Sequence, residues 1–350
     1  MNNINFKIGN KRVGPDQPIF IVAEISGNHN QSYKRAKKII DAAINAGVDA
    51  IKLQTYTADT LTIQSNKKCF RINKGPWAGH TLYDLYKKAY TPWAWQPKLK
   101  KYAEKKGVIL FSTPFDKTAV NFLEKMNVAL YKVASFEIVD IPLLKIIGQT
   151  KKPVIISRGM ASAKEIRLAI KTLKDNGTTQ IAVLHCVSSY PAQPEQMNLS
   201  TILNIARRFR VIPGLSDHSL SVTVPTASVA LGACIIEKHF TLNRADGGPD
   251  AEFSLQPNEL KKMVKSVREA QVAIGKPCYE SDKKESENIV FRKSLFAVEN
   301  IKKGEKFNTK NVRSIRPGYG LKSKYYDKII GKIAKTDIER GTPLSWDLIK

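Results

Sequence analysis

The sequence lacks the features that mark secreted, membrane-embedded and dinucleotide-binding proteins. It has four scattered cysteines (Cys69, Cys186, Cys234 and Cys278) without the paired spacing of a disulfide framework or a zinc site. No uncharged apolar run is long enough to cross a bilayer, and the first residues, MNNINFKIGN, hold no apolar signal core. No predicted strand leads into a G-x-G-x-x-G turn. We therefore expect a cytoplasmic protein with reduced thiols.

Acidic residues are scarce relative to basic ones. The 350 residues include 57 Lys+Arg against 31 Asp+Glu, a formal net charge of +26. Such a balance suits nucleic acid, anionic lipid or a small anionic substrate. The lysines are spread along helix-like stretches such as YKRAKKIIDAA and NELKKMVKSVREA, with no arginine-rich arm. We assign most of this charge to solvated surface and expect neither a nucleic-acid nor a membrane partner.

A short apolar run followed by an amphipathic stretch recurs eight times. The runs lie at 19–25, 48–56, 107–115, 129–135, 153–160, 181–191, 210–219 and 234–241. Several of the intervening helical patterns end in glycine, a common helix stop. Eight such units in this length predict an α/β fold, a closed (β/α)₈ TIM barrel rather than an open doubly wound sheet.

Two breaks in the pattern outline the domain organisation. Residues 57–96 form an insertion rich in Trp and Tyr, and residues near 275–288 are polar and typical of a linker. We predict a synthase barrel at 1–275, a linker at 276–288 and a small β-rich module at 289–350.

Polar side chains stand at the ends of the predicted strands, where barrel enzymes build their active sites. They are Glu24, Asn28, His29, Lys52, Gln54, Ser112, Thr113, Lys132, Ser135, Glu137, Ser157, Ser188, Tyr190, Asp217, His218, Glu237, Lys238 and His239. Lysines and hydroxyls suit a phosphate or carboxylate. Histidines ending adjacent strands can share a divalent cation. Plainer interpretations also exist: Lys238 reaches solvent or pairs with Glu237 in a structural ion pair, and a histidine here only satisfies hydrogen bonds.

Nine segments in this order carry a family resemblance: AEISGNHN, IKLQTY, FSTPFD, YKVASFE, SRGM, LHCVSSYP, GLSDHS, IEKHFT and GGPDAEFSL. Together they resemble the sialic acid (nonulosonic acid) synthase family, phosphoenolpyruvate-condensing barrels with a C-terminal antifreeze-like (SAF) domain. The resemblance covers nearly the whole chain. It implies a transferase that joins phosphoenolpyruvate to an amino sugar, uses Mn²⁺ or Mg²⁺ and acts as a domain-swapped homodimer.

The resemblance also assigns roles to individual positions. His218 and His239 match the metal ligands. The catalytic positions are Glu24, Lys52, Lys132 and Asp250. The substrate-binding positions are Gln54, Thr113, Ser135, Ser157, Ser188, Tyr190, Ser216 and Arg316. Of these, Arg316 matches an arginine that the other subunit contributes.

The acceptor sugar is indicated by the insertion and by GGPDAEFSL. These segments look most like the branch that uses 2,4-diacetamido-2,4,6-trideoxy-L-altrose, whose product decorates bacterial flagellins. The alternative is an N-acetylneuraminate or legionaminate synthase with a mannose-type acceptor. Three residues depart from the branch pattern: Ala94 replaces a glutamate, Arg158 a threonine and Glu252 a smaller residue.

Other reactions catalysed by barrel enzymes could use the same side chains. An aldolase would use Lys132 or Lys238 as a Schiff base. A 3-deoxy-sugar-acid synthase would act on a phosphorylated aldose, although the C-terminal module and the Trp-rich insertion argue against it.

Overall fold

A computed structural model describes residues 5–75 and 77–350. Residues 1–4 of the N-terminal segment and Pro76 of the predicted insertion lie outside this description. Contacts divide the chain into two compact units, Met1–Gly275 and Lys276–Lys350. Each unit has its own hydrophobic core.

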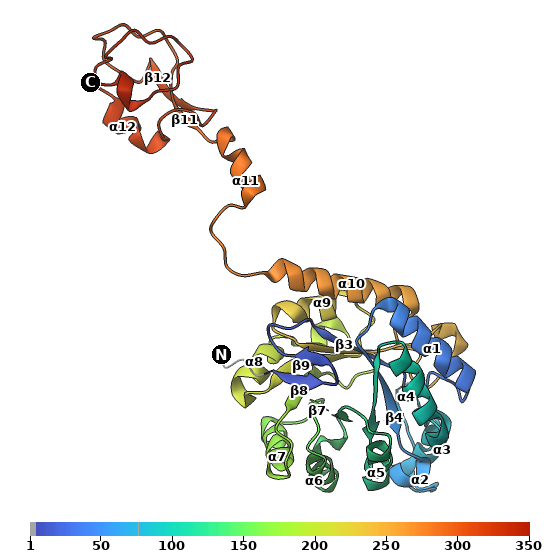
Figure 1. Cartoon of the computed structure of the whole chain (residues 1–350). Coiled ribbons are helices and arrows are strands. Elements are labelled where there is room, and N and C mark those ends of the chain that lie inside the picture. The colour runs from blue at the N-terminus through green and yellow to red at the C-terminus, as the bar shows by residue number, and fades with distance from the viewer. Residues whose placement is uncertain (1–4, 76) are drawn as a thin grey trace. The chain divides into compact units, whose positions relative to one another are not determined.

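The first unit is a closed barrel of eight parallel strands in the order β10-β3-β4-β5-β6-β7-β8-β9 (Figure 1). The strands are β3 (Phe20–Glu24), β4 (Ala50–Thr55), β5 (Ile109–Pro114), β6 (Tyr131–Val133), β7 (Val154–Ser157), β8 (Ile181–Cys186), β9 (Ile212–Asp217) and β10 (Ile235–His239). Every one lies within a run predicted from the sequence, and the (β/α)₈ prediction is confirmed.

A helix follows each strand of the barrel. The helices that return the chain to the next strand, or close the barrel unit after β10, are α1 (Tyr33–Ala46), α4 (Gln96–Lys105), α5 (Lys117–Lys125), α6 (Ile141–Gln149), α7 (Ala163–Asp175), α8 (Thr201–Phe209), α9 (Thr223–Ala230) and α10 (Pro257–Ile274). Local sequence explains their ends. Ser32 caps the start of α1 and Gly47 ends it in a left-handed conformation, while Ser162 and Glu165 form a capping box on α7.

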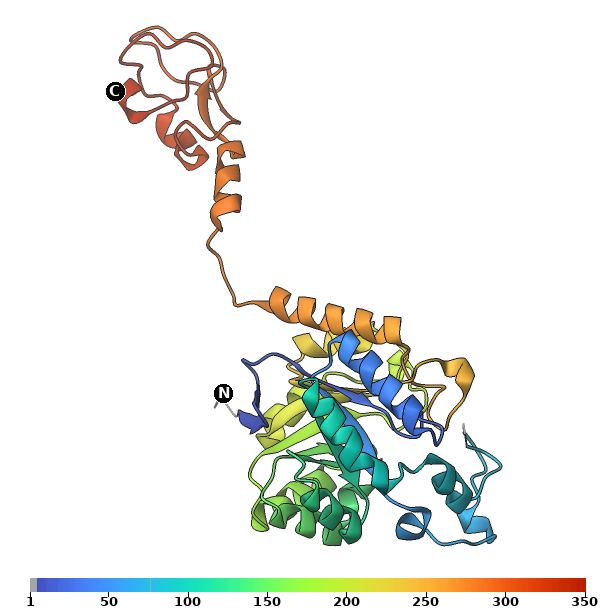
Figure 2. The same ribbon diagram turned by 45° about the vertical axis from the view of Figure 1, so that its right-hand side comes forward.

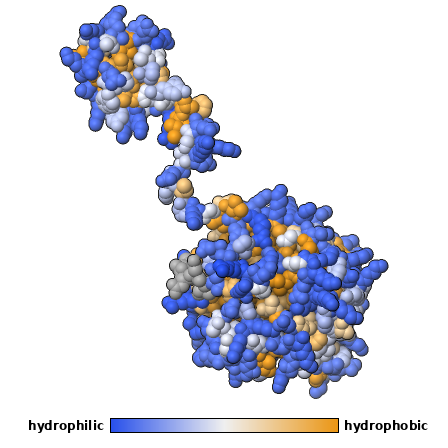
Figure 3. Space-filling model, in the orientation of Figure 1, coloured by the Kyte–Doolittle hydropathy of each residue, from blue (hydrophilic) through white to orange (hydrophobic). Residues whose placement is uncertain are grey.

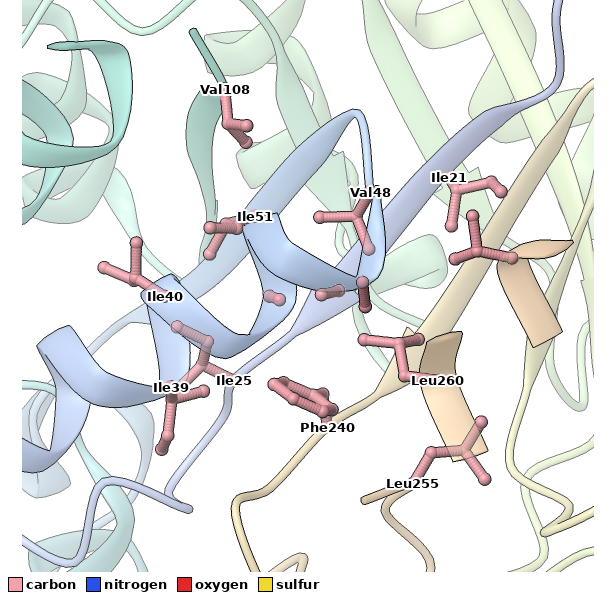
Figure 4. Packing of buried hydrophobic residues seen from close by; sticks show 14 of the residues in the cluster. Ile21, Ile25, Ile39, Ile40, Val48, Ile51, Val108, Phe240, Leu255 and Leu260 are labelled. Atoms are coloured by element: carbon pink, nitrogen blue, oxygen red, sulfur yellow. The ribbon is translucent and has the colours of Figure 1, made fainter. Parts of the chain in front are cut away.

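Apolar residues pack in two layers. Figure 4 shows the outer layer, where Ile39 and Ile40 of α1 and Leu260 of α10 join a cluster with Ile21 and Ile51 of the strands. The inner layer fills the barrel with side chains such as Phe111 and Ile155. It is continued by the hairpin β1 (Phe6–Ile8) and β2 (Lys11–Val13), which precedes β3. This packing leaves the carboxyl ends of the strands for polar side chains.

The insertion after β4 forms helices α2 (Ala58–Leu61) and α3 (Leu82–Ala89), and the 3₁₀ turn η2 (Trp93–Trp95) leads into α4. Hydrogen bonds attach it to two neighbouring loops. Gln31, before α1, donates to the carbonyls of Lys88 and Tyr90, and Trp77 Nε1 donates to the carbonyl of Pro249, after β10. Figure 2 shows the insertion at the edge of the barrel.

The second unit contains α11 (Lys283–Glu287), β11 (Ser294–Ala297), β12 (Val312–Ile315) and α12 (Tyr326–Ile329). Strands β11 and β12 pair antiparallel over a core that includes Leu295, Phe307 and Leu344. The predicted linker is therefore partly helical, because Asp282 caps α11.

Hydrophilic residues cover most of the barrel face shown in Figure 3, as expected of a chain rich in lysine. No helix within residues 5–75 and 77–350 combines the length and apolar composition needed to cross a bilayer.

Candidate active site

The carboxyl ends of the strands bury a cluster of opposite charges. Lys52 Nζ on β4 lies 2.5 Å from Glu24 Oε2 on β3 and 3.4 Å from Glu237 Oε1 on β10. Lys132 Nζ on β6 lies 3.6 Å from the same Glu237 oxygen, which also accepts a hydrogen bond from Ser216 Oγ at 3.0 Å. All five side chains are almost completely buried. A buried charge is tolerated when it is paired, so the pairing explains how this cluster is held inside the barrel.

Hydroxyl groups lie beside the two lysines. Lys132 Nζ donates to Ser157 Oγ at 2.6 Å, and Lys52 Nζ donates to Thr113 Oγ1 at 3.4 Å. Ser135 and Ser188 face Gly159, where a Cβ would stand 2.7 Å and 2.8 Å from their hydroxyl oxygens. The structure thus brings together two cations and several hydroxyl donors, which is the chemistry that holds phosphate or carboxylate oxygens.

The alternation of side chains along β9 and β10 separates inward from outward residues. Glu237 and His239 face the centre, while Lys238 between them faces the opposite side of the strand. There Lys238 Nζ lies 2.6 Å from Asp217 Oδ2, and both side chains are 0% exposed. Neither plain interpretation of Lys238 is correct, because it does not reach solvent and its partner is Asp217. Sealed behind the strands, Lys238 also cannot meet a substrate carbonyl as a Schiff base.

The charged cluster changes the pKa of its members. Burial alone would lower the pKa of Lys52, but Glu237 and Glu24 outweigh it and the pKa is raised. Burial lowers the pKa of Lys132, and Glu237 offsets this only in part. Burial would raise the pKa of Glu237, but Lys132 and Lys52 lower it instead. Glu237 therefore stays ionised and holds two lysines at once.

Glu137, which begins the 3₁₀ turn η3 (Glu137–Val139) after β6, gives a pH-dependent prediction. Burial raises its pKa from 4.5 to about 7. Between these values the folded state binds more protons than the unfolded state, so Glu137 makes stability fall as the pH rises. We expect Glu137→Gln to remove that fall, so that the variant gains stability relative to the parent across this window. Urea unfolding at a series of pH values measures it.

The control for Glu137 is the exposed Glu195, where replacement by glutamine should leave the pH profile unchanged. Parallel pH profiles for Glu137→Gln and the parent would contradict the prediction.

Two histidines lie beside this cluster: His239 ends β10, and His218 directly follows β9. Their ring centroids are 5.3 Å apart. His218 Nδ1 donates to the Val187 carbonyl at 2.8 Å, so the neutral ring carries its lone pair on Nε2, and His239 Nδ1 lies 3.3 Å from Ser26 Oγ. Burial holds the pKa of His239 well below its usual range, and the charge of nearby His218 lowers it further. Both rings thus have an Nε2 suited to a ligand.

The loop after β3 connects the histidines to further polar groups. Glu24 Oε1 accepts hydrogen bonds from the amide and hydroxyl of Ser26, and Gln54 Nε2 donates to the same hydroxyl at 3.2 Å. The amide of Gly27 donates to Asp250 Oδ2 at 3.3 Å, and burial raises the pKa of Asp250 to about 6. An aspartate with this pKa can exchange a proton near neutral pH.

Aromatic rings cover the histidines. Tyr190 lies 4.4 Å from the ring centroid of His218, and Phe253 lies 4.9 Å from that of His239. Trp77 of the insertion contacts both, with centroid distances of 5.5 Å to Tyr190 and 6.2 Å to Phe253. This aromatic layer screens the centre from water and so strengthens its electrostatic interactions.

Not every residue singled out in the sequence joins this centre. Arg316 belongs to the second unit, where its side chain is exposed, and Ala94 is exposed in η2. Arg158 turns toward β8, where its Nε and Nη2 lie 3.1 Å and 2.9 Å from His185 Nδ1. Glu252 is exposed on the loop after β10.

Glu237 was missing from the residues assigned a role, although it bonds to more of the charged cluster than any other carboxylate described above. The signal was available in the sequence: the alternation along a strand that places His239 in the centre also places Glu237 there. Trp77 and Phe253 gave no such signal, because their contact depends on loops that meet only in the folded chain.

The fold and this centre define a class: barrel enzymes that act on small anionic substrates at the carboxyl ends of their strands. Comparison with known families identifies the family. The NeuB family model matches residues 39–279, and the SAF domain model matches residues 292–350. The chain belongs to the NeuB family, and the predicted family is confirmed.

Several proteins are similar over almost the whole length. A pseudaminic acid synthase of Campylobacter jejuni (strain 81-176) is 43% identical over 338 residues, covering 97% of this chain and 98% of that protein. A pseudaminic acid synthase of Helicobacter pylori is 39% identical, covering 95% and 98%. The crystal structure of N-acetylneuraminic acid synthetase from Leptospira borgpetersenii, in complex with citrate, superposes with a TM-score of 0.73 at 34% identity, covering 82% and 95%.

Proposed function

We propose that this protein is a pseudaminic acid synthase. It condenses phosphoenolpyruvate with 2,4-diacetamido-2,4,6-trideoxy-L-altrose and water to give pseudaminic acid and phosphate. The observation that carries the proposal is the buried pair of lysines, Lys52 and Lys132, surrounded by hydroxyls at the mouth of a NeuB-family barrel. The choice of acceptor is supported by the similarity to two pseudaminic acid synthases.

The lysines and hydroxyls suit the phosphate and carboxylate of phosphoenolpyruvate. Lys132 with Ser157, and Lys52 with Thr113, supply two cation–hydroxyl pairs, and both lysines lie near the same oxygen of Glu237. Ser135, Ser188 and Ser216 add hydroxyl donors at the same mouth. Donors held in place before the substrate arrives contribute positioning and electrostatic stabilisation without reorganisation.

The reaction forms one carbon–carbon bond and, at carbon 2, exchanges the phosphate ester oxygen for the oxygen of water. Of the two protons that the water gives up, one goes to the former aldehyde oxygen of the sugar and one leaves with the phosphate. Carbon 3 of phosphoenolpyruvate attacks the aldehyde carbon of the open-chain sugar, positive charge develops at carbon 2, and water adds there. The tetrahedral intermediate then releases phosphate. Glu24 would take the proton of the water, and its contacts with Ser26 and Lys52 support this role. Asp250, whose pKa burial raises to about 6, would contact the acceptor sugar together with Gln54 and Tyr190.

The two histidines fit a divalent cation, Mn²⁺ or Mg²⁺. Each has its Nδ1 near a polar neighbour and its Nε2 available. Since the described residues contain no cluster of three or more His, Cys, Asp or Glu, water or substrate would complete the coordination. A cation bound here would act as a Lewis acid on the sugar carbonyl.

His239→Ala tests the metal assignment. We expect it to abolish metal-dependent phosphate release while the protein stays folded, because one of two nitrogen ligands is lost. In a thermal melt, Mn²⁺ should raise the melting temperature of the parent protein and not that of the variant. His80→Ala, outside the centre, should respond to Mn²⁺ as the parent does. Undiminished turnover in His239→Ala would refute the assignment.

A second copy of the chain would supply Arg316 to the acyl-amino sugar. Two features support a domain-swapped homodimer: Arg316 is exposed, and so are the apolar side chains of Val272, Tyr279 and Phe291 in the segment that runs from α10 toward β11. Light scattering at twice the chain mass is the expected result, and a monomer at assay concentration would refute it.

Phosphate release from phosphoenolpyruvate and Mn²⁺, with three acceptors in parallel, tests the function. The acceptors are the diacetamido-trideoxy-altrose, N-acetylmannosamine and the diacetamido-trideoxy sugar of mannose type. Turnover with the altrose alone supports the proposal. Turnover only with a mannose-type sugar would make the protein an N-acetylneuraminate or legionaminate synthase, and no turnover at all would refute the proposed chemistry.

A further inference from the structure

A small cavity of about 120 Å³ lies between α7 and α8, the helices that follow β7 and β8 (Figure 1). The residues used below are Arg158, Ile166, Thr201, Asn204, Arg208 and Phe209, all of which line it. None of them belongs to the reaction centre. Only Arg158 was singled out in the sequence, as a residue that replaces a threonine.

Arg158 lines this cavity from the outer side of the barrel wall. It directly follows Ser157, whose hydroxyl accepts a hydrogen bond from Lys132 in the reaction centre. The Arg158 amide still donates to the Leu184 carbonyl of β8, so the alternation of side chains that turns Ser157 inward turns Arg158 outward. The wall of the barrel therefore separates the cavity from the lysines of the centre.

Neutral groups hold the guanidinium of Arg158. Its Nε and Nη2 lie 3.1 Å and 2.9 Å from His185 Nδ1, and its Nη1 donates to the Gly159 carbonyl at 3.1 Å. His185 Nε2 donates to the Met197 carbonyl, which leaves Nδ1 as the acceptor. Burial lowers the pKa of His185 to about 4, so this ring is uncharged at neutral pH. Arg158 is half-buried, and its positive charge meets no anionic acceptor in the described part of the chain.

Two further arginines lie close by without a carboxylate. Arg208 of α8 lines the cavity, and the guanidinium carbons of Arg167 and Arg208 lie 5.9 Å and 6.0 Å from the ring centroid of Phe209. No described residue that lines the cavity is acidic. Within residues 5–75 and 77–350, the arginines that form ion pairs are Arg35, Arg244 and Arg268. Three uncompensated guanidinium groups in one place favour an anionic ligand.

The donors around the cavity define the chemistry of that ligand. His185 and Gly159 use three of the five N–H groups of Arg158, so two remain for a ligand. Arg208 adds a second guanidinium, and Thr201 and Asn204 add a hydroxyl and an amide. Two guanidinium forks with neutral donors beside them match the several oxygens and the double charge of a phosphate group.

The size and the walls of the cavity restrict the ligand further. A volume of about 120 Å³ holds only a few water molecules, so a whole sugar or nucleotide does not fit. Ile166 and Phe209 form apolar wall beside the arginines. Apolar wall excludes water on that side, and the attraction between a guanidinium and an anion is stronger there than in open solvent.

We propose that this cavity is a second anion site that binds a single phosphate group, either free phosphate or the phosphate of a small ester. The inference goes beyond the proposed function, because the site lies outside the reaction centre and takes no part in turnover. Arg158 and Arg208 neutralise the phosphate, and Thr201 and Asn204 donate to its remaining oxygens.

Neighbouring arginines on α8 provide a matched test. Arg208 lines the cavity and Arg207 does not, although both are exposed. Equilibrium dialysis of the full chain against labelled inorganic phosphate measures the affinity. Arg208→Met should raise the Kd of one phosphate site about tenfold, the usual effect of losing one charge-assisted contact, and Arg207→Met should stay within about twofold of the parent. Arg158→Thr should weaken the same site at least as strongly as Arg208→Met, because Arg158 is half-buried.

Lys132→Met separates this site from the reaction centre, since it removes a cation from the centre alone. We expect Lys132→Met to keep the phosphate site between α7 and α8, and Lys132→Met/Arg208→Met to lose it. Glycerol 3-phosphate and acetate are then added to Lys132→Met as competitors. Displacement of labelled phosphate by glycerol 3-phosphate would show that the site accepts esters, and displacement by unlabelled phosphate alone would assign it to the free anion. Either result supports the proposal.

Three outcomes would overturn the inference. The first is an equal phosphate affinity in the parent, Arg207→Met and Arg208→Met. The second is the loss of all phosphate binding in Lys132→Met that retains the circular dichroism of the parent, because the reaction centre would then be the whole of the binding. The third is competition by acetate as strong as that by phosphate, which would make the ligand a carboxylate. None of these measurements requires turnover, so a failure of the proposed function would leave them unaffected.

Discussion

Lys132→Met is expected to lower kcat/KM for phosphate release by about 10²–10³-fold, the range seen when one preorganised donor is removed from an active site. The Nζ of Lys132 is buried, donates to Ser157 Oγ at 2.6 Å and to the Val133 carbonyl at 3.2 Å, and lies 3.6 Å from Glu237. Methionine keeps the apolar stem and removes the charge. The anionic substrate then loses an attraction that is strong because the site is shielded from water.

Two controls separate substrate binding from charge balance. Lys145→Met, at an exposed position of α6, should leave kcat/KM unchanged. The double variant Lys132→Met/Glu237→Gln removes one charge of each sign, so it should recover stability lost in the single variant but not activity. Activity that returns together with stability would show that Lys132 serves only to neutralise Glu237.

Lys238→Met is expected to lower the free energy of unfolding of the barrel by about 3–5 kcal/mol, the usual effect of removing one partner of a buried ion pair. Lys238 and Asp217 are 0% exposed and 2.6 Å apart, and Lys238 also donates to the Ser219 carbonyl. Without the ammonium group, Asp217 keeps a buried charge, and among residues 5–75 and 77–350 only the Ser219 amide still donates to it. Denaturant unfolding measures the loss.

Replacing both partners should restore most of this stability, because no unpaired charge then remains. Lys238→Met/Asp217→Leu is therefore expected to be far more stable than Lys238→Met alone. The matched surface pair is Lys171 with Asp175, which are 69% and 55% exposed, and Lys171→Met should change stability by no more than about 0.5 kcal/mol. If Lys238→Met lowers the free energy of unfolding no more than Lys171→Met does, Lys238 and Asp217 are not a buried ion pair that stabilises the barrel.

The Lys238–Asp217 ion pair also bears on the active site, although neither side chain contacts the charged cluster. Asp217 precedes His218, and Lys238 precedes His239, so the pair joins the ends of the two strands that carry the histidines. If the pair positions the histidines, Lys238→Met/Asp217→Leu should regain more of the parent's free energy of unfolding than of its kcat/KM. Equal recovery of both would assign the pair to stability alone.

The eight strands were predictable from the sequence, because each strand is a short apolar run that is followed by an amphipathic helical stretch. The barrel's polar mouth was predictable for the same reason, since parallel strands deliver their carboxyl ends to one side. Lys52, Lys132, His218 and His239 were found in this way. The partly helical linker was not, because α11 depends on a single cap at Asp282 in a polar segment.

The sequence by itself determined the family, the two-unit plan and the residue types at each strand end, since these follow from local periodicity and from motifs that each lie within a few residues. Tertiary structure alone decided which neighbour each of those residues meets. Glu237 holds two lysines from β4 and β6, Lys238 turns away to Asp217, and Trp77 reaches Pro249 across 172 positions. Such contacts join segments that are distant along the chain, and closure of the barrel is what makes them neighbours.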